Sequence, residues 1–477
     1  MINTLSRAIE GKKQRMTIIG QIFRSALGSQ GFVAFARAAL RPFPKIEHHA
    51  RMLNYRLKRI GRAQSYQPAL QVNLANPSNE LEKTIFFDVS ELASRDVHTG
   101  IQRVVWSILS AMATLTLDQH SPVLVRADIR DRIIYAEKLF GKGFSSNNSV
   151  HPEGIIKISP GDLFFSADLR LTFPFSSLQE LHSNGLRVIF TIYDLFGLTL
   201  SDMLPESYQR SFMDWFTGVL ATADAIVCDS RAVADEVHAW LQNHSGARTT
   251  PLPIGYFHLG ANLENSKPTT GISNDDQRLL DRLKAETTLL MVGTVEPRKG
   301  HAPALDALEA LWKDGTDINL VIVGKEGWRS HALVRRLRRH PQRNKQLFWL
   351  EKVSDALLMQ LYAQSTALLA ASFAEGFGLP LIEAAHYGLP VIARDIPVFH
   401  EVAGDFAFYF PNTDSAALAD SLRHWLQLHA EGQAPRSADM PYLTWAQSTQ
   451  QLLKVILENH WYTTYQPADA RETANDE

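Results

Sequence analysis

Two glutamates lie eight positions apart in a stretch whose glycines and proline leave little freedom in how it can fold. Residues 374–388 read AEGFGLPLIEAAHYG, and the glutamates are Glu375 and Glu383. The apolar run before them, 367–372, has the length of a buried strand. The two glycines after Glu375 predict a loop. Pro380 predicts a helix that begins at this residue, since the first helical N–H has no partner in any case.

This order of strand, loop and short helix places both carboxylates at the carboxyl end of a buried strand. Glu375 lies in the loop, and Glu383 lies about one turn inside the helix with its side chain directed back toward the helix N-terminus. Open α/β sheets bind their ligands at this edge. Two carboxylates beside exposed backbone N–H groups suit a ligand that is both hydroxylated and anionic, such as a nucleotide sugar.

The string EGFGLPLIEA resembles the signature of the retaining glycosyltransferases of the GT-B fold, the large family 4 group that includes many bacterial mannosyltransferases. A bare pair of glutamates at this spacing is common by chance, but the glycine, proline and helix context is specific. An ordinary strand–loop–helix with a surface glutamate pair is the alternative. The resemblance covers residues 84–460 and is strongest over 288–410.

Length and composition exclude several classes of protein. A chain of 477 residues is too long for one typical core and suits two domains with additions. An apolar content of 45%, a charged content of 21% and a net charge of −2 are typical of a soluble enzyme and do not favour nucleic acid as a partner. The one cysteine, Cys228, lies in an apolar run, so we expect a buried strand residue and no internal disulfide. We expect a cytoplasmic protein, because no apolar run approaches the roughly 18 residues of a membrane span and the N-terminus does not resemble an export signal.

Residues 1–83 read as a basic helical extension followed by a linker. Residues 1–65 hold thirteen Lys and Arg against two Glu, with apolar residues at helical spacing between them. A basic amphipathic helix on an anionic membrane surface is one interpretation, and it would make the protein peripheral on the inner face of the cytoplasmic membrane. A helical pair docked on the catalytic domain, or an arm that binds a partner, is the other.

Beyond the extension, strand-length apolar runs alternate with helical stretches, and the alternation restarts after a polar break. Near-continuous apolar strands are buried on both faces, as in a parallel sheet. Two successive halves of this kind predict two Rossmann-like domains that face each other across a cleft, which is the GT-B arrangement. The expected parts are an N-terminal acceptor-side domain at 84–262, a linker at 263–285, a C-terminal donor domain at 286–440, a helix packing back on the N-terminal domain at 441–463 and a disordered tail at 464–477.

Two cations follow another predicted strand. The stretch MVGTVEPRKGH, residues 291–301, runs from a strand into a loop before a helix, and Arg298 and Lys299 lie in that loop. Fixed cations beside the free N–H groups of a helix N-terminus form a site for pyrophosphate. The pair also resembles the diphosphate-binding loop of the family, with one departure. Many relatives carry an arginine where this chain has Thr294, so Arg298 is expected to take over its role.

The resemblance implies a role for each matching residue. Glu383 is expected to accept hydrogen bonds from the ribose hydroxyls, and Glu375 to hold a hydroxyl of the transferred sugar. Glu375, Arg298 and Lys299 are the candidate catalytic residues. The other candidate donor-binding residues are Gly376, Phe377, Gly378 and Leu379 in the loop, Val353 beside the base and Gly100 near the phosphates.

The N-terminal domain supplies candidates on the acceptor and sugar side. Arg103 lies one turn into the first helix of the domain. Tyr193 stands where relatives often have a histidine near the reacting sugar, and Asp194 follows it. Ser230 either caps a helix or faces the cleft, and capping is favoured. Trp328 ends a stretch, GKEGW, that also resembles the family, although packing accounts for this residue equally well.

Together these residues predict a retaining glycosyltransferase that moves a mannose-like hexose from a nucleotide-diphospho-sugar. A GDP-sugar is the expected donor, because GTVEPRK resembles mannosyltransferase-type members, and the expected acceptor is a glycan or lipid-linked glycan of a bacterial surface polysaccharide, such as lipopolysaccharide O-antigen or an exopolysaccharide. No D-x-D string occurs, so neither a metal nor another cofactor is predicted. The lack of G-x-G-x-x-G after a strand argues against a dinucleotide oxidoreductase. A transferase that uses a UDP- or dTDP-sugar, and a non-catalytic scaffold that binds a nucleotide sugar, are the open alternatives.

Overall fold

The computed structural model describes residues 83–467 apart from 95–99, 116–119, 129, 137–153, 245 and 263–268. The expected basic extension lies outside the described residues except for its last position, and so does the expected tail from residue 468 onward. Within the described part, no helix is both long and apolar enough to cross a bilayer.

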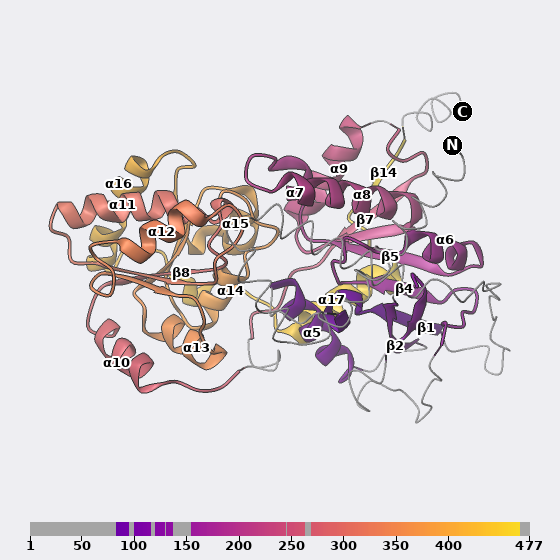
Figure 1. The fold of residues 1–477 in the computed structure, drawn as a ribbon, viewed down its shortest axis with the longest axis horizontal. Coiled ribbons are helices and arrows are strands. Elements are labelled where there is room, and N and C mark those ends of the chain that lie inside the picture. The colour runs from indigo at the N-terminus through magenta and orange to yellow at the C-terminus, as the bar shows by residue number, and fades with distance from the viewer. Residues whose placement is uncertain are drawn as a thin grey trace, which may run out of the picture. The chain divides into compact units, whose positions relative to one another are not determined.

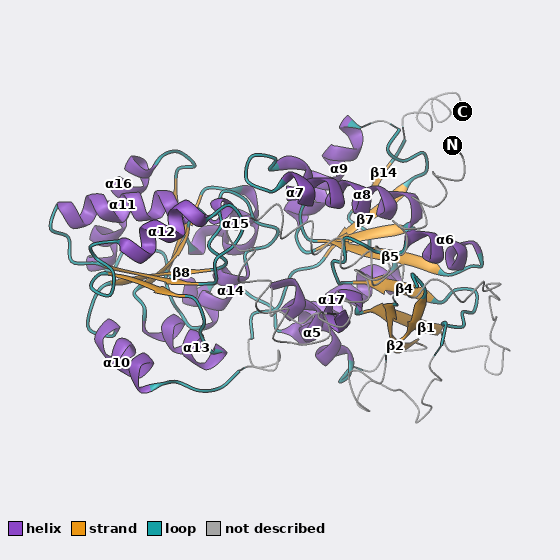
Figure 2. Ribbon diagram, in the orientation of Figure 1, coloured by secondary structure: helices purple, strands orange, loops and turns teal. Residues whose placement is uncertain are grey.

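Among the described residues, the first sheet consists of the strands Lys83–Asp88 (β1), His120–Ala127 (β2), Ile133–Tyr135 (β3), Leu163–Ser166 (β4), Arg187–Ile192 (β5), Ala225–Cys228 (β6), Leu252–Tyr256 (β7) and Thr463–Tyr465 (β14). Their order is β14-β7-β6-β5-β4-β1-β2-β3. Figure 2 draws the strands of this sheet in orange. Neighbouring strands are parallel except for the pairs β2–β3 and β14–β7. β4 and β6 are buried along their whole length, which explains why their sequences are apolar without alternation.

The helices around this sheet are Ser90–Ser94 (α4), Gly100–Met112 (α5), Phe175–Ser183 (α6), Phe196–Thr199 (α7), Glu206–Thr222 (α8), Arg231–Asn243 (α9) and Trp445–Glu458 (α17). Apolar side chains of α6, α8 and α9 pack in one core against the sheet, and those of α5 and α17 pack in the other. Figure 1 shows α8 and α9 on one side of the sheet and α5 and α17 on the other. Cys228 is fully buried in this core, which confirms that it is a buried strand residue.

The second sheet, within the described residues, has the strands Thr288–Val292 (β8), Asn319–Val323 (β9), Leu347–Leu350 (β10), Ala367–Ala370 (β11), Val391–Arg394 (β12) and Phe408–Phe410 (β13). Their order is β10-β9-β8-β11-β12-β13, and all neighbours are parallel. Two successive sheets, the first mostly parallel and the second fully parallel, confirm the expected pair of Rossmann-like α/β domains.

The helices of the second domain are Asn274–Leu283 (α10), His301–Lys313 (α11), His331–Arg339 (α12), Asp355–Gln364 (α13), Leu379–His386 (α14), Pro397–Ala403 (α15) and Ser415–Ala430 (α16), with short 3₁₀ turns at Pro297–Lys299 (η4), Gly404–Phe406 (η5) and Ser437–Asp439 (η6). In Figure 1, α11, α12 and α16 lie on one side of β8 and α10, α13 and α14 lie on the other. The buried side chains divide in the same way.

The polar stretch that the sequence suggests as a linker, 263–285, contains the helix α10. Ser273 and Asp276 form a reciprocal capping box at its start, which satisfies two otherwise unpaired N–H groups. Within this helix only Leu280 and Leu283 are buried. Charged and polar residues surround these two leucines in the sequence, so the apolar pattern is too weak to predict the helix.

The C-terminal end of the described chain returns to the first domain. α17 packs against α5 and β7, and the short strand β14 pairs antiparallel with β7. A strand of three residues with the sequence TTY carries too little pattern to be predicted, so β14 is a structural addition to the expected tail.

Candidate active site

The loop between β11 and α14 presents the first glutamate of the motif. Gly378, immediately before the helix, has a φ of 100°, a left-handed conformation that glycine adopts without strain. The helix begins at Leu379, so the prediction that Pro380 is its first residue is wrong by one position. Proline fits the second position as well, because that N–H also lacks an intrahelical acceptor.

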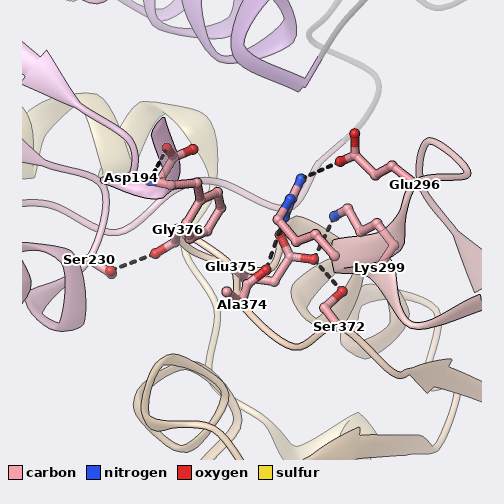
Figure 3. A network of polar contacts seen from close by, with 10 residues as sticks. Asp194, Ser230, Glu296, Lys299, Ser372, Ala374, Glu375 and Gly376 are labelled. Atoms are coloured by element: carbon pink, nitrogen blue, oxygen red, sulfur yellow. Dashed lines mark hydrogen bonds and ion pairs between the residues drawn. The ribbon is translucent and has the colours of Figure 1, made fainter. Parts of the chain in front are cut away.

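Glu375 lies at the centre of a cluster that brings the three candidate catalytic residues together (Figure 3). Its Oε2 accepts a hydrogen bond from Nη1 of Arg298 at 2.8 Å, and its Oε1 accepts one from Nζ of Lys299 at 2.5 Å. The hydroxyl of Ser372 donates to the same Oε1 at 2.6 Å. The two cations follow β8 and Glu375 follows β11. Because β8 and β11 are paired and parallel, both loops emerge at the same edge of the sheet.

Burial and neighbouring charges set the protonation of this cluster. Burial would raise the pKa of Glu375, but the positive charges of Lys299 and Arg298 outweigh it and lower the pKa to about 2. Burial lowers the pKa of Lys299. Burial would also lower the pKa of Arg298, but the carboxylates of Glu375, Glu296 and Asp194 outweigh it and raise that pKa. Glu375 is therefore ionised at neutral pH and fully engaged with cations.

Arg298 is held from several directions. Its Nη2 donates to Glu296 at 2.8 Å, and its Nη1 donates also to the carbonyl oxygen of Ala374 at 3.0 Å. The guanidinium carbon lies 4.9 Å from the ring centre of Phe196, a residue of the first domain. The carbonyl oxygen of Arg298 accepts from the N–H of Phe373 at 2.8 Å. The guanidinium is thus fixed in place before any ligand arrives.

The second glutamate of the motif, Glu383, is almost fully buried in α14. Tyr362 donates its hydroxyl to Oε2 at 2.6 Å, and Arg103 forms an ion pair with Oε1. Arg103 also lies 3.9 Å from Asp355. Arg103, a candidate for the acceptor side, therefore contacts Glu383, the candidate for binding the ribose hydroxyls. Since a carboxylate offers about four lone-pair sites, a ribose can share Glu383 with these two donors.

A second contact between the domains forms at the loop glycine Gly376 (Figure 3). The hydroxyl of Ser230 donates to the carbonyl oxygen of Gly376 at 2.6 Å and accepts from the N–H of Val233 at 3.1 Å. Ser230 therefore both caps α9 and faces the loop. A Cβ on Gly376 would lie 1.9 Å from the carbonyl oxygen of Tyr193, so this close approach requires glycine.

Tyr193 and Asp194, the two neighbouring candidates of the first domain, differ in the hydrogen-bonding groups that their side chains could offer to a ligand. Tyr193 is buried and donates its hydroxyl to the carbonyl oxygen of Ala167 at 2.7 Å, so its side chain is committed to its own domain. The carboxylate of Asp194 accepts from the N–H of Phe196 at 3.0 Å. Burial raises the pKa of Asp194 to about 6, although the charge of Arg298 opposes the shift.

The remaining sequence candidates are placed around the cluster without joining it. Phe377 is buried, with its ring centre 5.5 Å from that of His258. Leu379 and Val353 are half-buried against the apolar core. Gly100 is the exposed first residue of α5, and among the described residues no atom beyond its chain neighbours lies within 4 Å of a Cβ built on it.

The sequence analysis does not identify Tyr362, Ser372 or Glu401. Glu401 of α15 accepts from the N–H groups of Arg231 and Ala232 at the start of α9, each at 2.7 Å. Ser372 stands three positions before Glu375 and shortly after the end of β11, a local signal that could have found it. Tyr362 and Glu401 carry no such signal.

Comparison with known proteins identifies the second domain. The family described as glycosyl transferases group 1 matches residues 275–438, a stretch that contains both glutamates of the motif and both cations. Residues 275–438 belong to the glycosyl transferases of group 1. This group 1 domain runs from α10 to the turn η6, and its assignment confirms the resemblance carried by EGFGLPLIEA.

Mannosyltransferases are among the similar proteins. The serotype-specific mannosyltransferase WbdA of Escherichia coli is 40% identical over 377 residues, which cover 78% of this chain and 45% of that protein. The O-antigen chain mannosyltransferase B of Escherichia coli is 32% identical over 139 residues, or 29% of this chain and 36% of that protein. The chain therefore spans less than half the length of these curated relatives.

A solved structure reproduces the fold beyond the group 1 domain. Sucrose-phosphate synthase from Thermosynechococcus elongatus aligns with a TM-score of 0.52 and 17% sequence identity, covering 83% of this chain and 98% of that one. This likeness and the two α/β sheets confirm the expected GT-B fold.

Proposed function

We propose that this chain is a retaining glycosyltransferase that transfers a mannosyl residue from a GDP-linked donor to a glycan acceptor. The similarity to WbdA and to mannosyltransferase B supports mannose as the transferred sugar. Because mannosyltransferase B is named for the O-antigen chain, we extend the proposal to the synthesis of lipopolysaccharide O-antigen or a related surface polysaccharide.

The cluster of Arg298, Lys299 and Glu375 is the observation that carries this proposal. Two cations meet one carboxylate at the carboxyl edge of a parallel sheet, beside the N-terminus of α11. The diphosphate of a donor would replace Glu375 as the partner of both cations. Fixed positive charge then stabilises the diphosphate as the bond to the sugar breaks, and one such preorganised group is worth roughly 3 kcal/mol of the barrier.

Glu375 has a separate task in the proposed mechanism. Once the diphosphate takes the cations, this carboxylate accepts a hydrogen bond from a sugar hydroxyl and stabilises the positive charge that develops on the sugar ring. The acceptor oxygen attacks the anomeric carbon from the side of the leaving diphosphate, and the diphosphate accepts its proton, so configuration is retained. Arg298, Lys299 and the start of α11 supply the positive charge, and the proposed reaction requires no metal.

The nucleoside and acceptor ends complete the proposal. Glu383 would accept the ribose hydroxyls, Val353 would lie beside the base, and the backbone N–H groups after Gly376 would line the sugar and phosphates. A lipid-linked acceptor would bring the protein to the inner face of the cytoplasmic membrane. The excess of Lys and Arg in residues 1–65 supports that placement.

A scaffold that binds a nucleotide sugar without transferring it is the second candidate. It is favoured by the ion pairs that Glu375 makes with Arg298 and Lys299, because these pairs neutralise both cations in the structure. Such a scaffold would bind the nucleotide equally well when Glu375 is replaced, and it would turn over no donor.

Donor turnover across GDP-, UDP- and dTDP-sugars tests the proposal, with wild type beside Glu375→Gln and Lys299→Ala. We expect selective turnover of GDP-mannose that falls by about two orders of magnitude in each variant. Selective turnover of a UDP- or dTDP-sugar would correct the donor and keep the transferase. Binding without turnover of any donor, in the presence of mannosyl acceptors, would favour the scaffold.

A further inference from the structure

An exposed tryptophan lies beside the proposed active site. Trp328, in the loop between β9 and α12, is 43% exposed. Its ring meets that of Tyr208 from α8 edge to face, with 4.7 Å between the ring centres and 86° between the ring planes. The loop belongs to the second domain and α8 to the first, so the pair bridges the two domains at the surface.

The loop that carries Trp328 is held to the strand end that carries the cations. The N–H of Val295 donates to the carbonyl oxygen of Lys325, and the N–H of Gly327 donates to the carbonyl oxygen of Val295, each at 2.9 Å. The hydroxyl of Ser330 donates to the carbonyl oxygen of Gly327 at 2.9 Å. Trp328 is therefore presented by an ordered turn.

The residue after the tryptophan strengthens this conclusion. Arg329 has a φ of 52°, a left-handed conformation that costs a non-glycine residue about 1 kcal/mol. Its guanidinium donates to the carbonyl oxygen of Asp202 in the first domain. A strained backbone that is held by its surroundings directs Trp328 toward the facing domain.

Tyr208 connects this aromatic pair to the charges of the active site. Burial raises the pKa of Tyr208, the carboxylates of Asp194 and Glu296 add to the shift, and Arg298 opposes it, so these groups lie within electrostatic reach of one another. Among the described residues, nothing forms a hydrogen bond with the Tyr208 hydroxyl. A half-buried hydroxyl thus remains available beside an exposed indole ring.

We propose that Trp328 and Tyr208 form a subsite for a sugar ring of the acceptor glycan. A pyranose carries C–H groups on its face and hydroxyls around its rim. The face packs on an aromatic ring, and a rim hydroxyl pairs with the available Tyr208 hydroxyl. The inference rests on the proposed function, because it assumes that the sugar donor binds next to Lys299 and Glu375.

Arg298 separates the donor side from this subsite. One guanidinium nitrogen donates to Glu375 and the other to Glu296. The turn of Trp328 packs on the side of Glu296, since a Cβ built on Gly327 would lie 3.2 Å from the Cβ of Glu296. The turn of Trp328 therefore lies by the guanidinium nitrogen that pairs with Glu296, while Glu375 and Lys299 lie by the other nitrogen, so an acceptor ring at Trp328 would be next to the proposed donor side without overlapping it.

Steady-state kinetics with the donor found in the panel and synthetic mannotriose acceptors carrying an octyl group test the subsite. We expect Trp328→Ala to raise KM for the acceptor about tenfold, which is the loss of one aromatic stacking contact. KM for the donor should change much less. Trp328→Phe should recover most of the acceptor affinity, and Tyr208→Phe should raise the acceptor KM severalfold.

Tyr462→Ala is the matched control. Tyr462 is 44% exposed, and its ring meets that of Tyr256 edge to face at 5.3 Å and 82°, so it reproduces the exposure and geometry of Trp328 elsewhere on the surface. We expect wild-type kinetics from this variant. An unchanged acceptor KM in a Trp328→Ala variant that still transfers would overturn the subsite and leave the proposed function intact. Failure of the wild type to turn over any donor would overturn both.

Discussion

Replacing Glu375 by glutamine removes the charge at the centre of the cluster and keeps its shape. The two cations lower the pKa of Glu375 from its ordinary 4.5 to about 2. A carboxyl whose pKa is depressed in the folded state stabilises the fold at every pH above its unfolded value, and here that stabilisation is about 3 kcal/mol at pH 7. It is lost as the pH falls toward 2. We therefore expect Glu375→Gln to lower the free energy of unfolding by about 3 kcal/mol at pH 7 and by about 1 kcal/mol at pH 3.

Urea unfolding followed by tryptophan fluorescence at pH 7 and pH 3 measures this difference. Glu206→Gln is the control, because the Glu206 side chain is 80% exposed and its ion pair with Arg210 is a surface pair. Such pairs contribute about 0.5 kcal/mol or less, so this variant should match the wild type at both pH values. The comparison separates the loss of a buried charge from the loss of any carboxylate.

Two results would refute the reasoning. If Glu375→Gln and wild type unfold at the same urea concentration at pH 7, the cations do not stabilise Glu375 and the short contacts in the cluster carry no net energy. If the difference is as large at pH 3 as at pH 7, the loss comes from packing, because a charge effect must shrink as Glu375 approaches its pKa.

The other predictions concern the loop, the cations and the neighbouring carboxyl. Gly376→Ala should abolish most transfer and lower the melting temperature, because a Cβ there would lie 1.9 Å from a backbone oxygen of the facing domain. Gly100→Ala should fold with wild-type stability, since no atom of the described residues beyond its chain neighbours would lie within 4 Å of the new Cβ. Lys299→Ala should lower kcat about 100-fold with a smaller effect on KM for the acceptor, and Lys313→Ala, on the surface of α11, should not. Calorimetry in buffers of different ionisation enthalpy should show proton uptake on donor binding near pH 7 in wild type and much less in Asp194→Asn.

The strand, loop and helix around Glu375 can be predicted because the residues that determine them lie close together in the sequence. An apolar run, two glycines and a proline follow one another within fifteen positions, and only the first helical residue differs, by one position. The convergence of Arg298 and Lys299 on the same edge also follows from the sequence, since both segments follow strands of one parallel sheet.

The side chains that contact the candidate site residues from distant parts of the sequence cannot be predicted in this way. Arg103 and Glu383 are 280 positions apart, and Glu401 reaches the start of α9 across 170 positions. Tyr362 is an apolar-looking residue of an ordinary helix until α14 places a carboxylate against its hydroxyl. Which side chains meet across two domains depends on the packing of both, and a single sequence carries no local pattern for it.

In the proposed reaction, the electrostatics of the cluster would couple donor binding to the protonation of Asp194. Burial raises the pKa of this carboxyl to about 6, and the charge of Arg298, together with the hydrogen bond from the Phe196 N–H, opposes the rise. A diphosphate that pairs with Arg298 would neutralise that charge and add negative charge of its own, so the pKa of Asp194 would rise further when the donor binds. By linkage, the apparent affinity for the donor would then increase as the pH falls toward about 6. Asparagine at this position keeps the acceptor for the Phe196 N–H and removes the titration, so a flat affinity profile in Asp194→Asn beside a sloping wild-type profile isolates this carboxyl as the proton acceptor.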